Sequence, residues 1–418
     1  MNTPPAFPNA QDSDPITLGW MQGAPPSADK LIQYADSSFY KFPQLRWSFS
    51  NMRQLRPSTQ VSRGSGAVCA LPYALRSDLD AVACQVMFTG APLTWGEAFD
   101  ANYTDGIVVL HRGRVVYERY AGALDAAGQH IAHSVTKSFV GTMAASLLLE
   151  GALDDARLVT HYVPELAKSG LGSATLRQVM DMTSGIQYSE NYADPKAEIF
   201  DFVRAGGVFP RPPGYTGPST FYETLCAIVA EGAHGQAFAY KTVNTDTLGW
   251  VIRRITGQSL GQHLSQRIWS KLGVEQDAYF LVDTEGTEFA GGGFNAGLRD
   301  MARFGEAMRL GGAFNGQQIV PTAVVDDIML GAKKSDFAKA GSLTLPGWSY
   351  RNMWWNAHNA HGAFMARGVH GQAIYIDPKA EMVIARFGSH PMAANVHLDP
   401  TSLPAYAALA QHLVTNPG

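Results

Sequence analysis

The chain has 418 residues, 46% of them hydrophobic, which is enough for two domains or for one domain with a large insertion. Its net charge of −4, with no lysine- or arginine-rich run, argues against nucleic acid or an anionic membrane as a partner. No signal peptide, transmembrane run, disulfide framework or zinc spacing is visible, so we expect a cytoplasmic protein.

The N-terminal quarter of the chain carries few regular patterns. Residues 1–30 are rich in Pro, Ala, Asp and Ser and are predicted to form an irregular arm. Residues 30–100 alternate short apolar patches with Pro and Gly and predict no particular element. The first clear signal is an antiparallel hairpin, with strands over Gly106–His111 and Arg114–Tyr120 joined by a turn.

A long apolar helix is predicted next. Apolar residues recur at helical spacing from Val140 to Leu148, and Gly151 is placed to end the helix. Ser134 lies at its start and Lys137 one turn in, so the two side chains face the same side. Because a lysine amine can take the proton of a serine hydroxyl, this pair is a candidate nucleophile and base. A buried helix N-terminus would also stabilise an anionic intermediate.

Three further serines match motifs of nucleophiles, and context argues against each. Ser27 and Ser38 also begin Ser-x-x-Lys patterns, but neither has a buried helix behind it, so both are expected at the surface. Ser259 lies in a Gly-x-Ser-x-Gly sequence, which as a nucleophile elbow needs a preceding strand. The preceding segment has a helical period instead, so Ser259 is predicted to cap a helix.

The remaining elements predict a mixed fold. Residues 156–275 are mainly helical, and a C-terminal hairpin and helix follow. We therefore predict an α/β domain from residues 31–155 and 276–418, with a helical domain from residues 156–275 and the active site between the two. The helices are expected over residues 175–182, 245–255, 260–272 and 403–414, and the hairpin strands over residues 372–376 and 381–387.

Two tyrosines and one histidine stand out in the second half of the chain. Tyr192 lies in a predicted loop and Tyr240 in a short extended stretch before a helix. Tyrosines at such places usually pack against neighbours, but a phenol near a lysine can act as acid or base. Glycines flank His370 at the start of a predicted edge strand, which favours close approach of a substrate. The alternative is a tight turn with a surface histidine.

Histidine pairs at helical spacing raise the question of a metal site. His130 with His133, and His358 with His361, have compatible spacings, but neither pair has the adjacent glutamate of the His-Glu-x-x-His motif. We expect no metal and no organic cofactor.

The ordered set of these motifs resembles the serine β-lactamase and penicillin-recognising superfamily. The esterases of that superfamily and the 6-aminohexanoate-dimer (nylon-oligomer) hydrolases are the most similar in appearance. The resemblance runs from about residue 46 to residue 390 and includes residues 46–49, 162–166, 244–246, 354–355 and 370–372. It implies a β-lactamase-like α/β (α+β) fold, with an antiparallel sheet flanked by helices plus an all-helical domain.

The resemblance also implies roles for individual residues. Ser134 would form the acyl-enzyme and Lys137 would activate it, with Tyr240 sharing the proton. Tyr192 would protonate the leaving amine, and the backbone N–H groups of Ser134 and Val369 would form the oxyanion hole. The implied substrate-binding residues are His370, Gly371, Gln372, Thr242 and Trp355.

The chain departs from the family pattern in three places. Threonine at position 242 replaces the usual Asn or Ser of the second box but keeps a hydroxyl group. The third box, His370-Gly371-Gln372, lacks the lysine that receives a β-lactam carboxylate, so efficient β-lactamase activity is not expected. Val203 and Ala394 stand where acidic residues hold a substrate ammonium group, so a neutral substrate is at least as well favoured as an amino-terminated one.

The sequence thus predicts a serine hydrolase that cleaves a small-molecule ester or amide. Two alternatives stay open, a peptidase of the D-aminopeptidase or carboxypeptidase type and a non-catalytic penicillin-binding-like sensor. A homodimer is permitted.

Overall fold

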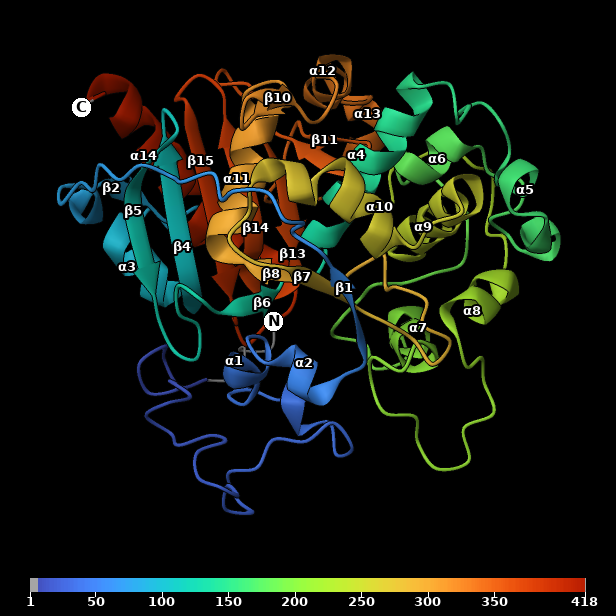
Figure 1. Cartoon of the computed structure of the whole chain (residues 1–418), viewed down its shortest axis with the longest axis horizontal. Helices are drawn as coiled ribbons and strands as arrows, with labels where there is room; N and C mark the ends of the chain where they lie inside the picture. The colour runs from blue at the N-terminus through green and yellow to red at the C-terminus, as the bar shows by residue number, and fades with distance from the viewer. Residues whose placement is uncertain (1–6, 418) are drawn as a thin grey trace.

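The structure is a computed structural model that describes residues 7–417, and it separates a sheet-containing side from a helical side (Figure 1). The main sheet is antiparallel and has seven strands in the order β11-β12-β13-β14-β15-β4-β5. These strands are β11 (Ser349–Arg351), β12 (Trp354–Asn356), β13 (Phe364–Gly368), β14 (Gln372–Asp377), β15 (Met382–Gly388), β4 (Thr104–His111) and β5 (Arg114–Tyr120).

Both chain ends build this sheet, as the sequence predicts. The β4–β5 hairpin turns through Arg112 and Gly113, which have φ angles of 51° and 75°, as a tight hairpin turn requires. Strand β15 from the C-terminal hairpin pairs with β4 in antiparallel register. The predicted α/β class with an antiparallel sheet is confirmed. The expectation that β14 is an edge strand is wrong, because it lies between β13 and β15.

Helices cover both faces of the sheet because its side chains alternate between them. On one face, α11 (Leu298–Arg309) approaches so closely that a Cβ on Gly305 would meet Val383 and Ile374. On the other face, α14 (Asp399–Thr415) places Tyr406 5.2 Å from the Tyr375 ring. The helix α3 (Trp95–Ala101) packs beside α14.

The helix α4 (Val135–Leu149) is the buried centre of the molecule, as predicted. It packs against β13, β14 and α9 (Val243–Thr256), and almost all of its side chains are buried. A Cβ on Gly141 would lie 2.1 Å from the Asn352 carbonyl oxygen, so only glycine permits this packing distance. The first turn of α4 therefore has a fixed position between the sheet and the helices.

Between β6 and β7 the described chain forms helices and loops but no strand. After α4 the helices are α5 (Val159–Tyr162), α6 (Leu176–Met180), α7 (Glu198–Ala205), α8 (Phe221–Ala227), α9 and α10 (Leu260–Arg267). The predicted helix over residues 260–272 ends early because the backbone of Ile268 leaves the helical region, and a 3-10 turn, Trp269–Leu272, follows. Ser259 caps α10, with its Oγ accepting the Gln262 N–H at 3.1 Å. The boundaries at residues 156 and 275 stay a prediction.

A second, four-stranded sheet joins the N-terminal segment to the rest of the chain. Its order is β1-β7-β8-β6, with β1 (Ser58–Val61), β7 (Ala278–Leu281), β8 (Phe294–Gly297) and β6 (Gln129–Ile131). The smaller elements are α1 (Leu45–Ser48), α2 (Met52–Leu55), β2 (Ala83–Gln85), β3 (Pro92–Thr94), β9 (Ala313–Phe314), β10 (Gln317–Gln318), α12 (Thr322–Leu330) and α13 (Lys334–Ala338).

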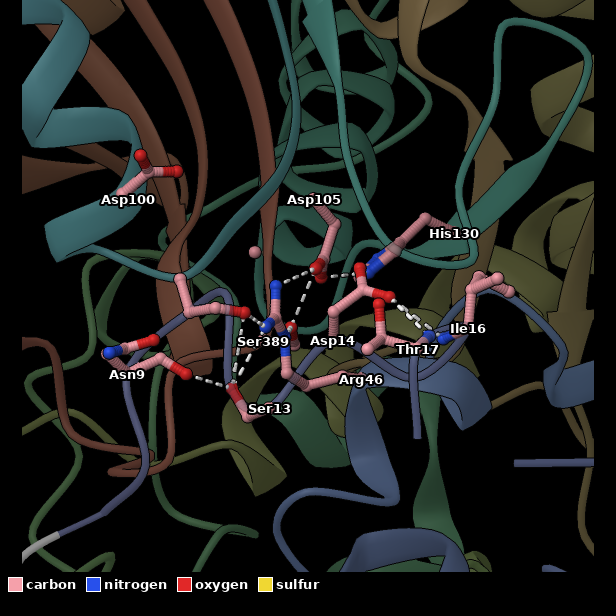
Figure 2. Close-up of polar contacts among 12 residues, drawn as sticks. Asn9, Ser13, Asp14, Ile16, Thr17, Arg46, Asp100, Asp105, His130 and Ser389 are labelled. Carbon is pink, nitrogen blue, oxygen red and sulfur yellow. Dashed lines mark hydrogen bonds and ion pairs between the residues drawn. The ribbon is translucent and has the colours of Figure 1, made fainter. Parts of the chain in front are cut away.

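A buried ionic network anchors the N-terminal segment. Figure 2 shows Arg46 between the arm and the sheet; its guanidinium lies 3.3 Å from Asp105 Oδ1, and Ser389 Oγ donates to the same oxygen at 2.8 Å. Arg46 also donates to the Ser13 hydroxyl at 3.0 Å, and the His130 ring lies 3.3 Å from Asp105 Oδ2. The described part of the arm, residues 7–30, is therefore irregular in backbone but held in place by these contacts, and residues 1–6 lie outside the described residues.

One surface prediction in this segment is wrong. Ser38 is buried, because its Oγ accepts the Gln33 N–H at 2.8 Å and donates to the Gln33 carbonyl at 3.1 Å, which closes the turn before Tyr40. Lys41 and Ser27 are both exposed, as expected.

We predict that Asp105→Asn lowers the free energy of unfolding by about 3 kcal/mol, because it leaves the buried Arg46 charge without its carboxylate. Denaturant unfolding measures the effect. The control is Asp100→Asn, which removes a half-exposed carboxylate paired with Arg119 and should cost less than about 1 kcal/mol. Equal losses in the two variants would contradict the anchoring role of Arg46.

Candidate active site

The site begins at the first turn of α4, where Ser134 and Lys137 meet. Lys137 Nζ lies 2.8 Å from Ser134 Oγ, and both side chains are buried, with 1% of Lys137 exposed. Ser134 stands at the N-cap position, but its side chain makes no capping hydrogen bond. Its hydroxyl is therefore directed to the lysine rather than to the helix backbone.

Burial makes the charged form of the Lys137 amine less favourable. Desolvation lowers the pKa of its amine to about 8, while the nearby Glu190 and Asp246 carboxylates raise it in part. The amine also donates to the Gly291 carbonyl oxygen. With this pKa about a tenth of the amine is neutral at pH 7, and that form can accept the Ser134 proton.

A buried carboxylate, Asp246, and a half-buried one, Glu190, flank the lysine, and sequence reasoning assigned neither a role. Desolvation raises the pKa of Asp246 to about 7, and its Oδ1 accepts the Gly291 N–H at 3.2 Å. Burial also raises the pKa of Glu190, whose side chain accepts the Thr242 N–H. Gly291 thus contacts Lys137 through its carbonyl and Asp246 through its amide.

Tyr240 and Tyr192 reach the same centre from the helical side. The Tyr240 ring centroid is 5.1 Å from Lys137 Nζ, and the ring stacks on Trp355 at 5.4 Å. Tyr192 Oη donates to Glu190 Oε2 at 3.1 Å. Burial and the Glu190 charge raise the pKa of both phenols, so both keep their protons and can donate them.

The start of α4 lies against the end of β13. A Cβ on Gly368 would be 3.0 Å from the Ser134 backbone nitrogen and 2.7 Å from the Ala132 carbonyl oxygen, so the close approach needs glycine. Val369 follows directly and borders the same cavities as Ser134. This juxtaposition is the one that the predicted oxyanion hole requires.

The third box does not line these cavities. His370 is buried and lines neither cavity, so it is not a surface histidine and its side chain is not open to a substrate. The Gln372 side chain holds β15, because it donates to the Gly388 carbonyl at 2.7 Å and accepts the Gly388 N–H at 2.9 Å. A Cβ on Gly371 would meet the Arg386 guanidinium at 2.9 Å. These three residues therefore hold the backbone next to the site and do not contact the cavities.

Two cavities meet at Ser134, Tyr192 and Val369. One is apolar and has a volume of about 60 Å³; its walls include Phe39, Phe49, Met52, Ile199, Phe200, Val203, Phe209 and Leu281, with Thr242 and Tyr40 as polar members. The other, the polar cavity, is larger, about 370 Å³, and its lining is more polar than that of the first; its walls include Glu190, Tyr240, Thr344, Trp355, Arg367, Ala394, Asn395 and Asp399. Arg367 and Asp399 form a buried ion pair.

The histidines that raised a metal hypothesis have other contacts. The His130 ring lies beside Asp105, His361 Nδ1 lies 3.0 Å from Asp377, and His358 Nε2 lies 2.7 Å from Ser349 Oγ. Within residues 7–417, no group of three or more His, Cys, Asp or Glu side chains is arranged to hold a metal ion. In the same range, no helix is long and apolar enough to cross a membrane.

Three comparisons place this geometry among known proteins. The family model described as Beta-lactamase matches residues 100–392. The 6-aminohexanoate-dimer hydrolase of Paenarthrobacter ureafaciens is 34% identical over 355 residues, which are 85% of this chain and 88% of that protein. A solved structure named as a candidate 6-aminohexanoate-dimer hydrolase from Bacillus anthracis is 35% identical, with a TM-score of 0.84 over 94% of this chain and all of the other.

A more distant structure shares the fold alone. A family VIII carboxylesterase matches with a TM-score of 0.55 at 18% identity, over 82% of this chain and 99% of that one.

We predict that the rate at which a fluorophosphonate modifies Ser134 increases about tenfold per pH unit and levels off above about pH 8, as Lys137 loses its proton. In Asp246→Asn the levelling should move about one unit lower, because the lost carboxylate stabilises the ammonium form and so raises the pKa. Mass spectrometry follows the labelling.

Asp201→Asn, an exposed change on α7, is the control and should leave the profile in place. A flat profile, or a shift to higher pH in Asp246→Asn, would contradict the role given to the amine.

Proposed function

The chain belongs to the beta-lactamase family, and from this premise we propose that it is a serine hydrolase that cleaves small-molecule esters or amides through an acyl-enzyme on Ser134. The observation that carries the proposal is the 2.8 Å contact between Lys137 Nζ and Ser134 Oγ at a buried helix start. The 6-aminohexanoate-dimer hydrolase among the relatives supports hydrolysis of an amide, whereas the carboxylesterase shows only that the same fold occurs in an enzyme that cleaves esters.

Acylation begins with proton transfer to the lysine. Ser134 Oγ attacks the substrate carbonyl carbon while its proton passes to neutral Lys137 Nζ. The carbonyl oxygen becomes an oxyanion, which accepts hydrogen bonds from the backbone N–H groups of Ser134 and Val369. Each such donor lowers the barrier by roughly 3 kcal/mol.

The leaving group then takes the proton. The bond from the carbonyl carbon to the leaving oxygen or nitrogen breaks, and the proton moves from Lys137 through the Tyr240 hydroxyl to that atom. Tyr192 is a second donor on the same side. Water next attacks the acyl-enzyme, gives its proton to Lys137 and releases the acid, and Ser134 regains its proton.

The two cavities suggest how a substrate lies in the site. Tyr240 and Glu190 line only the polar cavity, so the group that needs a proton on leaving belongs there. The acyl group then occupies the small apolar cavity, whose volume of about 60 Å³ suits a short chain. We infer a preference for short, apolar acyl groups.

The charge distribution supports a neutral acyl group. Val203 lies in the wall of the apolar cavity and Ala394 in that of the polar one, so neither cavity has a carboxylate at these positions to hold an ammonium group. Because an unpaired charge in an apolar cavity is costly, an amino-terminated acyl chain would bind less well than an alkyl chain.

Ser134→Ala is expected to abolish hydrolysis of p-nitrophenyl butyrate, because it removes the nucleophile; the loss should exceed about a thousandfold. The matched control is Ser259→Ala, which removes a helix cap and should keep turnover while lowering stability by about 1 kcal/mol. Steady-state assays and thermal unfolding measure both.

Retained turnover in Ser134→Ala would overturn the assignment. A stable adduct on Ser134 without turnover would favour the penicillin-binding-like sensor, and turnover of D-amino acid peptides alone would favour the peptidase.

Val203→Asp is expected to reverse the acyl preference. The new carboxylate in the apolar cavity should lower kcat/KM for p-nitrophenyl butyrate about tenfold and raise it for the 4-aminobutyrate ester. Val203→Asn, of similar shape but uncharged, is the control and should not favour the amino ester. An unchanged ratio of the two esters in Val203→Asp would refute the placement of the acyl group.

A further inference from the structure

The backbone that follows Val369 has a conformation that side-chain-bearing residues rarely adopt. His370 has a φ of 61° and a ψ of 9°, and Gly371 follows with a φ of 100°. A left-handed residue beside a functional amide persists only when its surroundings hold it there. The direction of the Val369 N–H group therefore depends on what holds His370.

The His370 imidazole is held at both of its nitrogens. Nδ1 lies 2.7 Å from the His390 carbonyl oxygen, and Nε2 lies 2.9 Å from Tyr40 Oη. Because a carbonyl only accepts, Nδ1 carries the proton, and the neutral ring must accept the Tyr40 hydroxyl at Nε2. Burial lowers the pKa of His370 to about 4, so this neutral form persists around neutral pH.

Among residues 7–417, aromatic and imidazole rings surround the His370 ring, and no carboxylate contributes to the shift of its pKa. Phe49 and Tyr40 pack edge-on at 5.1 and 5.3 Å, and the His133 ring lies 5.6 Å away. The charges of His390 and His130 would further disfavour an imidazolium here. Two backbone bonds assist, from the His370 N–H to Ala393 and from the His390 N–H to His370.

Tyr40 comes from the N-terminal segment and is itself fixed. It ends the 3-10 turn Ser38–Tyr40, and its ring packs edge-on against Phe209 at 4.8 Å and against Phe49. Burial raises the pKa of its phenol, so the hydroxyl keeps the proton that it donates. Tyr40 lies outside the residues that match the family model, and it also borders the apolar cavity.

We propose that Tyr40 is a positioning residue of the oxyanion hole: its hydroxyl, through His370, fixes the left-handed turn that aims the Val369 N–H at the developing oxyanion. The proposal rests on the proposed function. It gives the N-terminal segment a part in catalysis in addition to its part in the wall of the acyl cavity. It also gives His370 a role that needs no contact with substrate.

The test is Tyr40→Phe, which keeps the ring and removes only the donor. For p-nitrophenyl butyrate, kcat should fall about tenfold with KM nearly unchanged, because the interaction is gained in the transition state. For the matched thionoester, whose sulfur accepts N–H hydrogen bonds poorly, the loss should be less than about twofold. A general loss of structure would affect both esters equally.

Tyr34→Phe is the matched control, because the Tyr34 hydroxyl donates to the Gly207 carbonyl at 2.7 Å and Tyr34 lines neither cavity. It should leave both rates and their ratio unchanged. If Tyr40→Phe has no effect, or reduces the ester and thionoester rates equally, the proposal is overturned while the role of Ser134 stands. A wild-type enzyme that hydrolyses neither ester would instead refute the proposed function.

Nitrogen-15 NMR of the wild-type His370 ring gives a readout independent of turnover. A protonated Nδ1 and an unprotonated Nε2 are expected, and Tyr40→Phe should shift the Nε2 resonance as it loses its hydrogen bond. A proton on Nε2 in the wild-type protein would overturn the proposal whatever the rates show.

Discussion

The burial of one lysine amine is the constraint on which the site depends. An ammonium group that is 1% exposed loses its hydration, and desolvation of this kind favours the neutral form. The surroundings offset part of this cost with the Ser134 hydroxyl, the Gly291 carbonyl and the carboxylates of Glu190 and Asp246. The balance leaves an amine that is neither permanently charged nor permanently neutral, which is what a base for serine needs.

The positions of the surrounding elements follow from keeping that amine buried. Gly141 lets α4 pack closely on the turn between β11 and β12, and Gly368 lets the end of β13 approach the start of α4. The aromatic ring of Tyr240, stacked on Trp355 of β12, lies against the lysine amine. The N-terminal segment, anchored through Arg46 and Asp105, supplies Phe39, Tyr40, Phe49 and Met52 to the wall of the apolar cavity at Ser134.

The sequence predicts many of the helices and strands and the central pair of the site, and the features that it does not predict depend on contacts between distant residues or on loops. The α4 helix and both hairpins follow from local periodicity, so Ser134 and Lys137 could be placed without a structure. The pairing of strands from opposite chain ends is not local, which is why β14 was wrongly expected at an edge. Glu190 lies in a loop without a pattern, and the turn at Ser38 is held by side-chain hydrogen bonds, so neither leaves a periodic signal. The positioning role proposed for His370 depends on a hydrogen bond with Tyr40, which is 330 residues away in the sequence.

The most direct test of the central claim is an NMR titration of the Lys137 amine itself, in protein labelled with ¹³C at the lysine ε-carbons and assigned with a Lys137→Met variant. We predict one resonance, absent from the variant, that titrates near pH 8, well below the value of about 10.4 of a free lysine side chain. A Lys137 resonance that titrates together with the exposed lysines would contradict the account, because the amine would then be fully charged at neutral pH and unable to take the proton of Ser134.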